Sequence, residues 1–124
     1  MGKKAEVLIL DDEQIVCERL QERLAKEGLG IEIFTDSQRA LERLSEKEFD
    51  VVVTDIKMKG PTGLEVLRFI RERSPRTQVI VITGYATIEL AREAEFIGAY
   101  QVICKPFQLD EVASAIGRAA KKAR

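Results

Sequence analysis

Five polar side chains stand directly at the ends of apolar runs in this sequence. Asp11 and Asp12 follow the run at 7–10, and Asp55 closes the run at 51–53 after one threonine. Thr83 follows the run at 79–82, and Lys105 follows the run at 102–104. Three carboxylates held close together repel one another at neutral pH, so such a group attracts a cation.

The types of these side chains suit magnesium and phosphoryl chemistry. A site built from oxygen ligands favours Mg²⁺, which keeps several waters and accepts phosphate oxygens. A lysine that faces the same site neutralises a phosphoryl group as a point charge, and a threonine hydroxyl donates a hydrogen bond to it. Asp55 then remains as a carboxylate nucleophile, for which an aspartyl phosphate is a known covalent product.

Each of these residues also has an ordinary interpretation when it is taken alone. Asp11 or Asp12 could cap a helix, and Asp55 could cap a loop. Thr83 with its glycine could form a turn, and Lys105 with its proline could close a loop. Their shared placement at successive strand ends favours one site.

The pattern of apolar residues predicts five strands that alternate with five helices. We expect strands at 5–10, 31–34, 51–55, 78–82 and 100–104, with 51–55 buried on both faces. Helical spacing covers 15–24, 40–44, 64–70, 88–97 and 109–116, with Ser37 as an N-cap and Gly98 as a C-cap. This alternation predicts an α/β fold of the flavodoxin-like, doubly wound kind. Its five parallel strands have the order 2-1-3-4-5, and helices form a layer on each face. Ligands bind such sheets at the carboxyl ends of the strands.

Composition limits the class of protein. The 124 residues suit a single domain over 1–124, and 45% apolar residues are enough for one core. A net charge of −1, from 20 basic and 21 acidic residues, argues against an electrostatic nucleic-acid binder. No apolar run approaches the roughly 18 residues of a membrane span, and no signal peptide is evident, so we expect a cytoplasmic protein. Histidine is absent, and Cys17 and Cys104 are expected to be small buried residues.

Several short motifs follow the predicted strands. They are Asp11-Asp12, Asp55 with Met58 and Gly63, Thr83-Gly84, and Lys105-Pro106-Phe107. Together these motifs resemble the receiver domain of two-component response regulators, and the resemblance covers essentially the whole chain. Residues 83–87 and 98–100 are similar to receivers of the nitrogen-regulation type.

The resemblance implies a phosphorylation switch. Asp55 would accept a phosphoryl group from a phosphohistidine on a sensor histidine kinase, with Mg²⁺ as cofactor. Asp12 and Asp55 would bind the metal directly with the backbone carbonyl of Lys57, and Asp11 would hold it through water. Thr83 and Lys105 would contact the phosphoryl group, with a cis peptide bond before Pro106.

The resemblance also implies what surrounds this chemistry. The domain would catalyse its own phosphorylation and dephosphorylation, as a switch rather than a turnover enzyme. Output, and a homodimer, would use the helix at 88–97, the strand at 100–104 and the helix at 109–116. The domain itself would contact neither nucleic acid nor membrane. Relatives of this type usually precede an ATPase and a DNA-binding domain, so a domain cut from a longer regulator is favoured over a stand-alone receiver.

Two departures from the family pattern leave an alternative open. Val102 stands where the family usually carries tyrosine or phenylalanine, and Lys59 stands where many members carry proline. The alternative is a receiver-like interaction domain that does not respond to phosphorylation. A flavin-binding carrier would need glycine, serine or threonine after the first strand. An aspartyl phosphatase would need acids at alternate positions.

Two further side chains suggest how long the phosphoryl group lasts. In receivers, the residues two places after the aspartate and two after the threonine influence the approach of water; here they are Lys57 and Tyr85. Neither suits the orientation of an attacking water, so we expect slow loss of the phosphoryl group. The alternative is that both side chains point to solvent.

Overall fold

Strands and helices alternate along the chain, as the apolar pattern predicts. The computed structural model describes residues 4–84 and 87–123. In chain order the elements are β1 (Glu6–Leu10), α1 (Gln14–Ala25), β2 (Gly30–Phe34), α2 (Ser37–Glu46), β3 (Val51–Asp55), α3 (Gly63–Arg73), β4 (Gln78–Thr83), α4 (Ile88–Ile97), β5 (Gln101–Cys104) and α5 (Leu109–Ala123).

The five strands form one parallel sheet in the order β2-β1-β3-β4-β5, which confirms the predicted topology. The chain reverses direction across the sheet between β1 and β3, which are direct neighbours. Every residue of β3 and of β4 is buried, whereas β2, at an edge, is half-buried along its length. The central strands are therefore covered on both faces, as their continuous apolar runs require.

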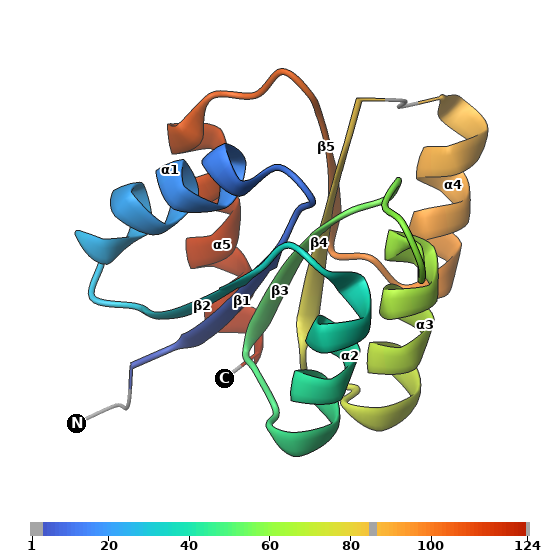
Figure 1. The fold of residues 1–124 in the computed structure, drawn as a ribbon, viewed down its shortest axis with the longest axis horizontal. Coiled ribbons are helices and arrows are strands. Elements are labelled where there is room, and N and C mark those ends of the chain that lie inside the picture. The colour runs from blue at the N-terminus through green and yellow to red at the C-terminus, as the bar shows by residue number, and fades with distance from the viewer. Residues whose placement is uncertain (1–3, 85–86, 124) are drawn as a thin grey trace.

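Helices cover both faces of the sheet, so the molecule has three layers (Figure 1). α1 and α5 pack on one face, and α2, α3 and α4 pack on the other. Successive strand side chains point to opposite faces. Val53 accordingly belongs to the core beneath α1 and α5, and Val52 belongs to the core beneath α2, α3 and α4. Two apolar cores, one on each face, thus hold the sheet in place.

The helix ends agree with the predictions at α4 and differ at α2. Gly98 ends α4 with a positive φ of 119°, as expected of a C-cap glycine. The N-cap of α2 is Asp36, whose side chain accepts a hydrogen bond from the Arg39 N–H, so the assignment of that role to Ser37 was wrong. Ser37 is instead the first helical residue. Its buried hydroxyl donates to the carbonyl oxygen of Lys59 at 3.0 Å.

The two cysteines lie in different surroundings. Cys17 is buried, as predicted, and its thiol contacts the carbonyl oxygens of Asp11 and Phe34. Burial raises the pKa of this thiol to about 11, so it stays protonated and unreactive at neutral pH. Cys104 is exposed, which corrects the expectation for it. It ends β5, the outermost strand, where less of the structure covers a side chain.

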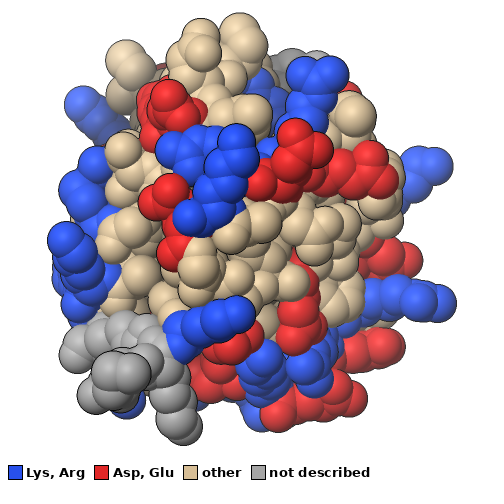
Figure 2. All heavy atoms as spheres, turned by 90° about the vertical axis from the view of Figure 1, so that its left-hand side faces the viewer, with Lys and Arg blue, Asp and Glu red and all other residues tan. Residues whose placement is uncertain are grey.

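The described structure contains no helix suited to cross a membrane, and the side of the molecule that carries α1 is not uniformly basic. Across residues 4–84 and 87–123, no helix combines the length and apolar character that crossing a membrane requires. On the side of the molecule that carries α1, acidic and basic side chains interleave (Figure 2). That face therefore lacks the single-sign charge expected of a nucleic-acid surface.

Gly63 lets the start of α3 approach the end of β3. Its backbone N–H donates to the carbonyl oxygen of Ile56 at 2.8 Å, which closes the loop between the two elements. A Cβ atom at this position would overlap the carbonyl oxygen of Asp55 and would lie 2.7 Å from the Cα atom of Ile56. Only glycine fits this backbone contact.

We predict that Gly63→Ala destabilises the protein by about 3 kcal/mol, because the clash is with backbone that cannot rotate away. Gly117→Ala is the matched control. Nothing lies within 4 Å of a Cβ built at Gly117, and the residue is inside α5. That change should stabilise the protein by about 0.5–1 kcal/mol through helix propensity. Urea unfolding of both variants measures the difference, and equal stabilities would contradict the contact.

Candidate functional site

The predicted site residues lie at the carboxyl ends of β1, β3, β4 and β5, and these strand ends all lie on the same side of the sheet (Figure 1). Asp11 follows β1, Asp55 is the last residue of β3, and Thr83 is the last residue of β4. One carboxylate oxygen from each of Asp11, Asp12 and Asp55 lies within 4.8 Å of the others. The structure thus brings Asp55 next to two acids that lie more than forty residues earlier in the sequence.

Lys105 lies among these acids. Its Nζ is 2.8 Å from Oδ2 of Asp11, 2.9 Å from Oδ2 of Asp55 and 3.3 Å from Oε1 of Glu13. Burial alone would lower the pKa of Lys105, but its contacts with Asp11 and Asp55 outweigh that effect and raise the pKa above its ordinary value. The side chain is therefore a fixed positive charge at neutral pH.

Asp11 is the most deeply placed of the acids, with no exposed surface. Its Oδ1 accepts a hydrogen bond from the Glu13 N–H at 2.9 Å, and its Oδ2 pairs with the Lys105 ammonium. Burial raises the pKa of Asp11 in spite of the lysine. The ionised form of Asp11 is thus the costly component of the site.

Asp55 and Asp12 are more accessible. Asp55 has a side chain that is 10% exposed. Its Oδ1 accepts from the Ile56 N–H at 2.7 Å, and its Oδ2 accepts from Lys105. Asp12 is exposed to solvent beside them. Both carboxylates can therefore be reached from outside, as a metal ligand or a nucleophile must be.

Thr83 and Lys105 lie next to each other across two neighbouring strands. The Lys105 N–H donates to the carbonyl oxygen of Thr83 at 2.8 Å, and Thr83 is in register with Cys104. Thr83 is buried. The peptide bond between Lys105 and Pro106 is cis, as the resemblance implied. The threonine and the lysine therefore belong to the same rigid corner of the site.

Lys57 lies in the loop between β3 and α3, with its side chain exposed. The loop is closed at its base by the Gly63–Ile56 hydrogen bond and is held further along by Ser37. Tyr85 lies outside the described residues. The idea that Lys57 and Tyr85 slow the loss of a phosphoryl group therefore stays a prediction.

Glu13 is a member of the site that the sequence did not single out. It accepts a hydrogen bond from the Lys105 Nζ across 92 positions of sequence, and it is the N-cap residue of α1. The sequence did contain one indication of this role, because Glu13 is the third acid in the run 11–13. Nothing in that run, however, shows that a side chain at the start of one helix reaches a lysine from the far strand.

The donor set fits a hard divalent cation. Asp11, Asp12 and Asp55 offer carboxylate oxygens and no nitrogen or sulfur ligand. The Lys105 ammonium contacts Asp11, Asp55 and Glu13, and Asp12 lies beside the first two, so negative charge remains in excess there. An oxygen-rich site of this charge suits Mg²⁺ better than zinc.

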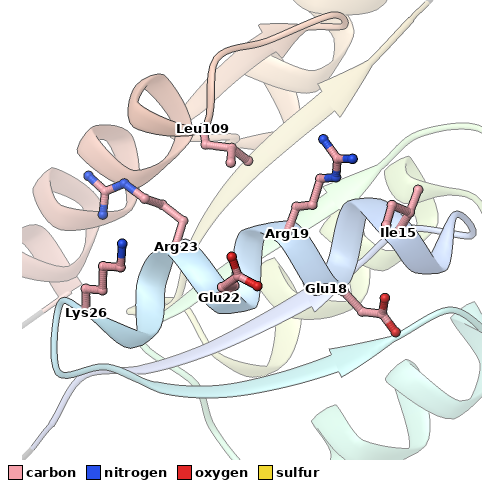
Figure 3. A pocket seen from close by; sticks show the side chains of 7 residues that line it. All are labelled: Ile15, Glu18, Arg19, Glu22, Arg23, Lys26 and Leu109. Atoms are coloured by element: carbon pink, nitrogen blue, oxygen red, sulfur yellow. The ribbon is translucent and has the colours of Figure 1, made fainter.

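A separate groove lies between α1 and the start of α5 (Figure 3). Ile15 and Leu109 are its apolar members, and acidic and basic side chains of α1 alternate along it. This alternation neutralises charge instead of concentrating it at one point. The groove therefore lacks a group of like charges that attracts a cation, such as the one that Asp11, Asp12 and Asp55 form. Its lining residues are Ile15, Glu18, Arg19, Glu22, Arg23, Lys26 and Leu109.

We predict that Asp11→Asn makes the protein more stable than the wild type at pH 7 in the absence of divalent metal. Because the pKa of Asp11 is raised, the stability that this group contributes is fully present below its ordinary value of 3.8. That stability is lost as the pH rises through the raised value. The advantage of Asp11→Asn should therefore shrink as the pH falls from 7 toward 4. Urea unfolding of both proteins across this range tests the sign, and an advantage that grew on acidification would contradict it.

Comparison with known proteins agrees with this site. A family model described as "Response regulator receiver domain" matches residues 7–117. A putative response regulator NtrX-like from Rickettsia conorii is 39% identical over 118 residues, which are 94% of this chain and 25% of that protein. The DNA-binding transcriptional regulator NtrC of Escherichia coli K12 is 34% identical over 113 residues, 91% of this chain and 24% of that protein.

Solved structures show the same fold. The solution structure of the beryllofluoride-activated NtrC4 receiver domain dimer has a TM-score of 0.90 and 32% identity, covering 96% of this chain and 98% of that one. A receiver domain protein from Clostridium thermocellum has a TM-score of 0.88 and 29% identity, with 95% of each chain covered. This chain spans about a quarter of the length of the curated relatives named above. The chain belongs to the response regulator receiver domains of two-component signal transduction.

Proposed function

We propose that residues 1–124 form one phosphorylation-switched receiver, in which Asp55 accepts a phosphoryl group from a sensor histidine kinase with Mg²⁺ as cofactor. The observation that carries this proposal is the Lys105 ammonium, 2.9 Å from Oδ2 of Asp55 inside a cluster of acids. A carboxylate beside a fixed cation and a metal site can be approached by an anionic phosphoryl donor.

In this proposal the metal ligands are Asp12, Asp55 and the backbone carbonyl of Lys57, with Asp11 acting through a water. Bound Mg²⁺ would neutralise negative charge on the phosphoryl oxygens. These residues offer the oxygen donors that such an ion prefers, and two of the carboxylates are open to solvent.

The transfer then uses the other side chains. An oxygen of Asp55 attacks phosphorus as the bond between phosphorus and the kinase imidazole nitrogen breaks, so the phosphoryl group passes to the carboxylate. Lys105 holds an oxygen of the group by charge, and the Thr83 hydroxyl donates a hydrogen bond to it. Attack by water on the same phosphorus would release inorganic phosphate and restore Asp55. The domain is in this sense a self-resetting switch and not a turnover enzyme.

The relatives suggest the setting of this switch. NtrC is named as a DNA-binding regulator, and this chain aligns with only a quarter of it. We place the present domain in the cytoplasm, with DNA contact left to another part of a longer regulator. Its own near-neutral charge gives it no electrostatic reason to bind nucleic acid.

The wild-type protein should gain one phosphoryl group when incubated with acetyl phosphate and Mg²⁺, as measured by intact mass. Asp55→Asn should not gain it, because the nucleophile is gone. Asp12→Ala should lose at least roughly tenfold in rate, because a metal with few protein ligands loses most of its affinity with one of them. Asp110→Ala is the control, since that exposed acid pairs with Arg23 on the outer surface.

A wild-type protein that gains no mass under these conditions would overturn the proposal. That result would favour the alternative function, a receiver-like interaction domain that does not respond to phosphate, for which Val102 is the motivation. Gain of mass by Asp55→Asn at the wild-type rate would instead show that another residue accepts the phosphoryl group.

The surface formed by α4, β5 and α5 is the proposed output and homodimer face. On α4, Phe96 is 92% exposed and Ile88 is 67% exposed, the largest such values among the exposed apolar residues described. Exposed aromatic side chains are typical anchors of protein interfaces. The NtrC4 receiver, similar in structure, is described as a dimer. We propose that phosphorylation of Asp55 brings two copies of this chain together through this face.

We predict that beryllofluoride with Mg²⁺ shifts the protein from monomer toward dimer in analytical ultracentrifugation. Phe96→Ala should weaken that dimer roughly tenfold, as expected for an apolar anchor. Ile15→Ala, which removes an apolar side chain that is 53% exposed on α1, should leave the dimer unchanged. A dimer that is weakened by Ile15→Ala and not by Phe96→Ala would place the interface on α1 instead.

A further inference from the structure

Lys105 occupies a position that a bound metal ion would contest. Its Nζ contacts Oδ2 of Asp11 and Oδ2 of Asp55, and both residues belong to the group of acids that could hold a cation. The ammonium is itself largely buried, with a side chain that is 19% exposed. In the described structure the acids are thus already partly neutralised by a cation of the chain's own.

The buried carboxylate of Asp11 explains why a cation is needed there at all times. Its Oδ1 is engaged by the Glu13 N–H, and its Oδ2, with no hydrogen bond of good geometry, is matched only by the charge of Lys105. A buried carboxylate without a compensating charge is strongly unfavourable. Lys105 can leave Asp11 only when another cation takes its place.

Glu13 differs from the other partners of Lys105. Its side chain is 61% exposed, whereas that of Asp11 is fully buried and that of Asp55 is 10% exposed. Its backbone is fixed, because its N–H donates to Asp11. The exposed carboxylate can therefore follow the ammonium outward at little desolvation cost, while the two buried carboxylates stay where they are.

We propose that Lys105 is the internal counter-ion of the metal-free site and that a divalent cation binds by exchange against it. Glu13 is the positioning residue that keeps the displaced ammonium at the mouth of the site. The inference rests on the proposed metal site. It adds that Lys105 competes with the metal for the carboxylates and that Glu13 holds the displaced ammonium. Metal affinity is then set by how firmly Lys105 is held as well as by the metal ligands.

The first test is Mg²⁺ affinity, measured by isothermal titration calorimetry without any phosphoryl donor. Lys105→Met should bind Mg²⁺ roughly tenfold more tightly than the wild type, because a competing charge a few ångströms away is gone. Glu13→Gln should bind about threefold more weakly, the size of an exposed ion pair. Glu18→Gln, the same change five residues further along the chain in α1, should have no effect.

The double variant Glu13→Gln with Lys105→Met shows whether Glu13 acts through the lysine. If Glu13 only positions Lys105, its removal has no effect once the lysine is gone. An equal loss of affinity in both backgrounds would show that Glu13 acts through its own charge, and would overturn the positioning role. Unchanged or weaker Mg²⁺ binding by Lys105→Met would overturn the exchange itself.

A second measurement avoids the risk that Lys105→Met does not fold. In protein with ¹⁵N-labelled lysine, the ammonium signal of Lys105 should shift on addition of Mg²⁺ in the wild type and broaden in Glu13→Gln. A signal that does not move as Mg²⁺ saturates the site would overturn the exchange. The metal site itself is tested by two other outcomes. If the wild type failed to bind Mg²⁺, or if Asp12→Ala bound it as tightly as the wild type, the proposed function would be overturned together with this inference.

Discussion

The ion pair between the buried Asp11 carboxylate and the Lys105 ammonium is the interaction on which the site depends. A parallel sheet delivers every strand to the same edge, so acids that end neighbouring strands must crowd there. Burial raises the pKa of Asp11, which means that the ionised form of this carboxyl group is costly inside the protein. Lys105, the residue that follows the outer strand, supplies the opposite charge from the far side of the sheet. The carboxylates of Asp11 and Asp55 therefore gain their opposite charge only when β1, β3 and β5 are all part of the sheet.

The two helical layers that support this edge are packed to different degrees. α5 buries an apolar stripe along its whole length, from Val112 to Ala123. α4 buries Ala94 alone among the residues that the structure describes, and it leaves Ile88 and Phe96 exposed. An element with few buried contacts is the least costly to move. A change at the end of β4 is therefore better accommodated by α4 than by α5, which anchors the opposite face.

The fold could be predicted because strand ends and charge changes coincide in this sequence. The segment from Val51 to Asp55 begins with three valines and ends with a carboxylate at the carboxyl end of the strand. The structure buries that strand on both faces. The start of α2 could not be fixed in the same way, because Asp36 and Ser37 are both good capping residues one position apart. The exposure of Cys104 depends on β5 being the outer strand and on what covers its end, which local sequence does not encode. The contact between Glu13 and Lys105 depends on side-chain directions across 92 positions, which topology leaves open.

Val102 limits how a signal could cross from the site to the outer face. The residue is half-buried against the core beneath α2, α3 and α4, and as an aliphatic side chain it has no ring to rotate. The structure offers another connection at the same place, because the Lys105 N–H is hydrogen-bonded to the Thr83 carbonyl and Thr83 is in register with Cys104. A displacement of Thr83 would therefore act on the backbone of β5 directly. Strand pairing thus links Thr83 directly to β5 in this chain, and Val102 serves as packing beside it.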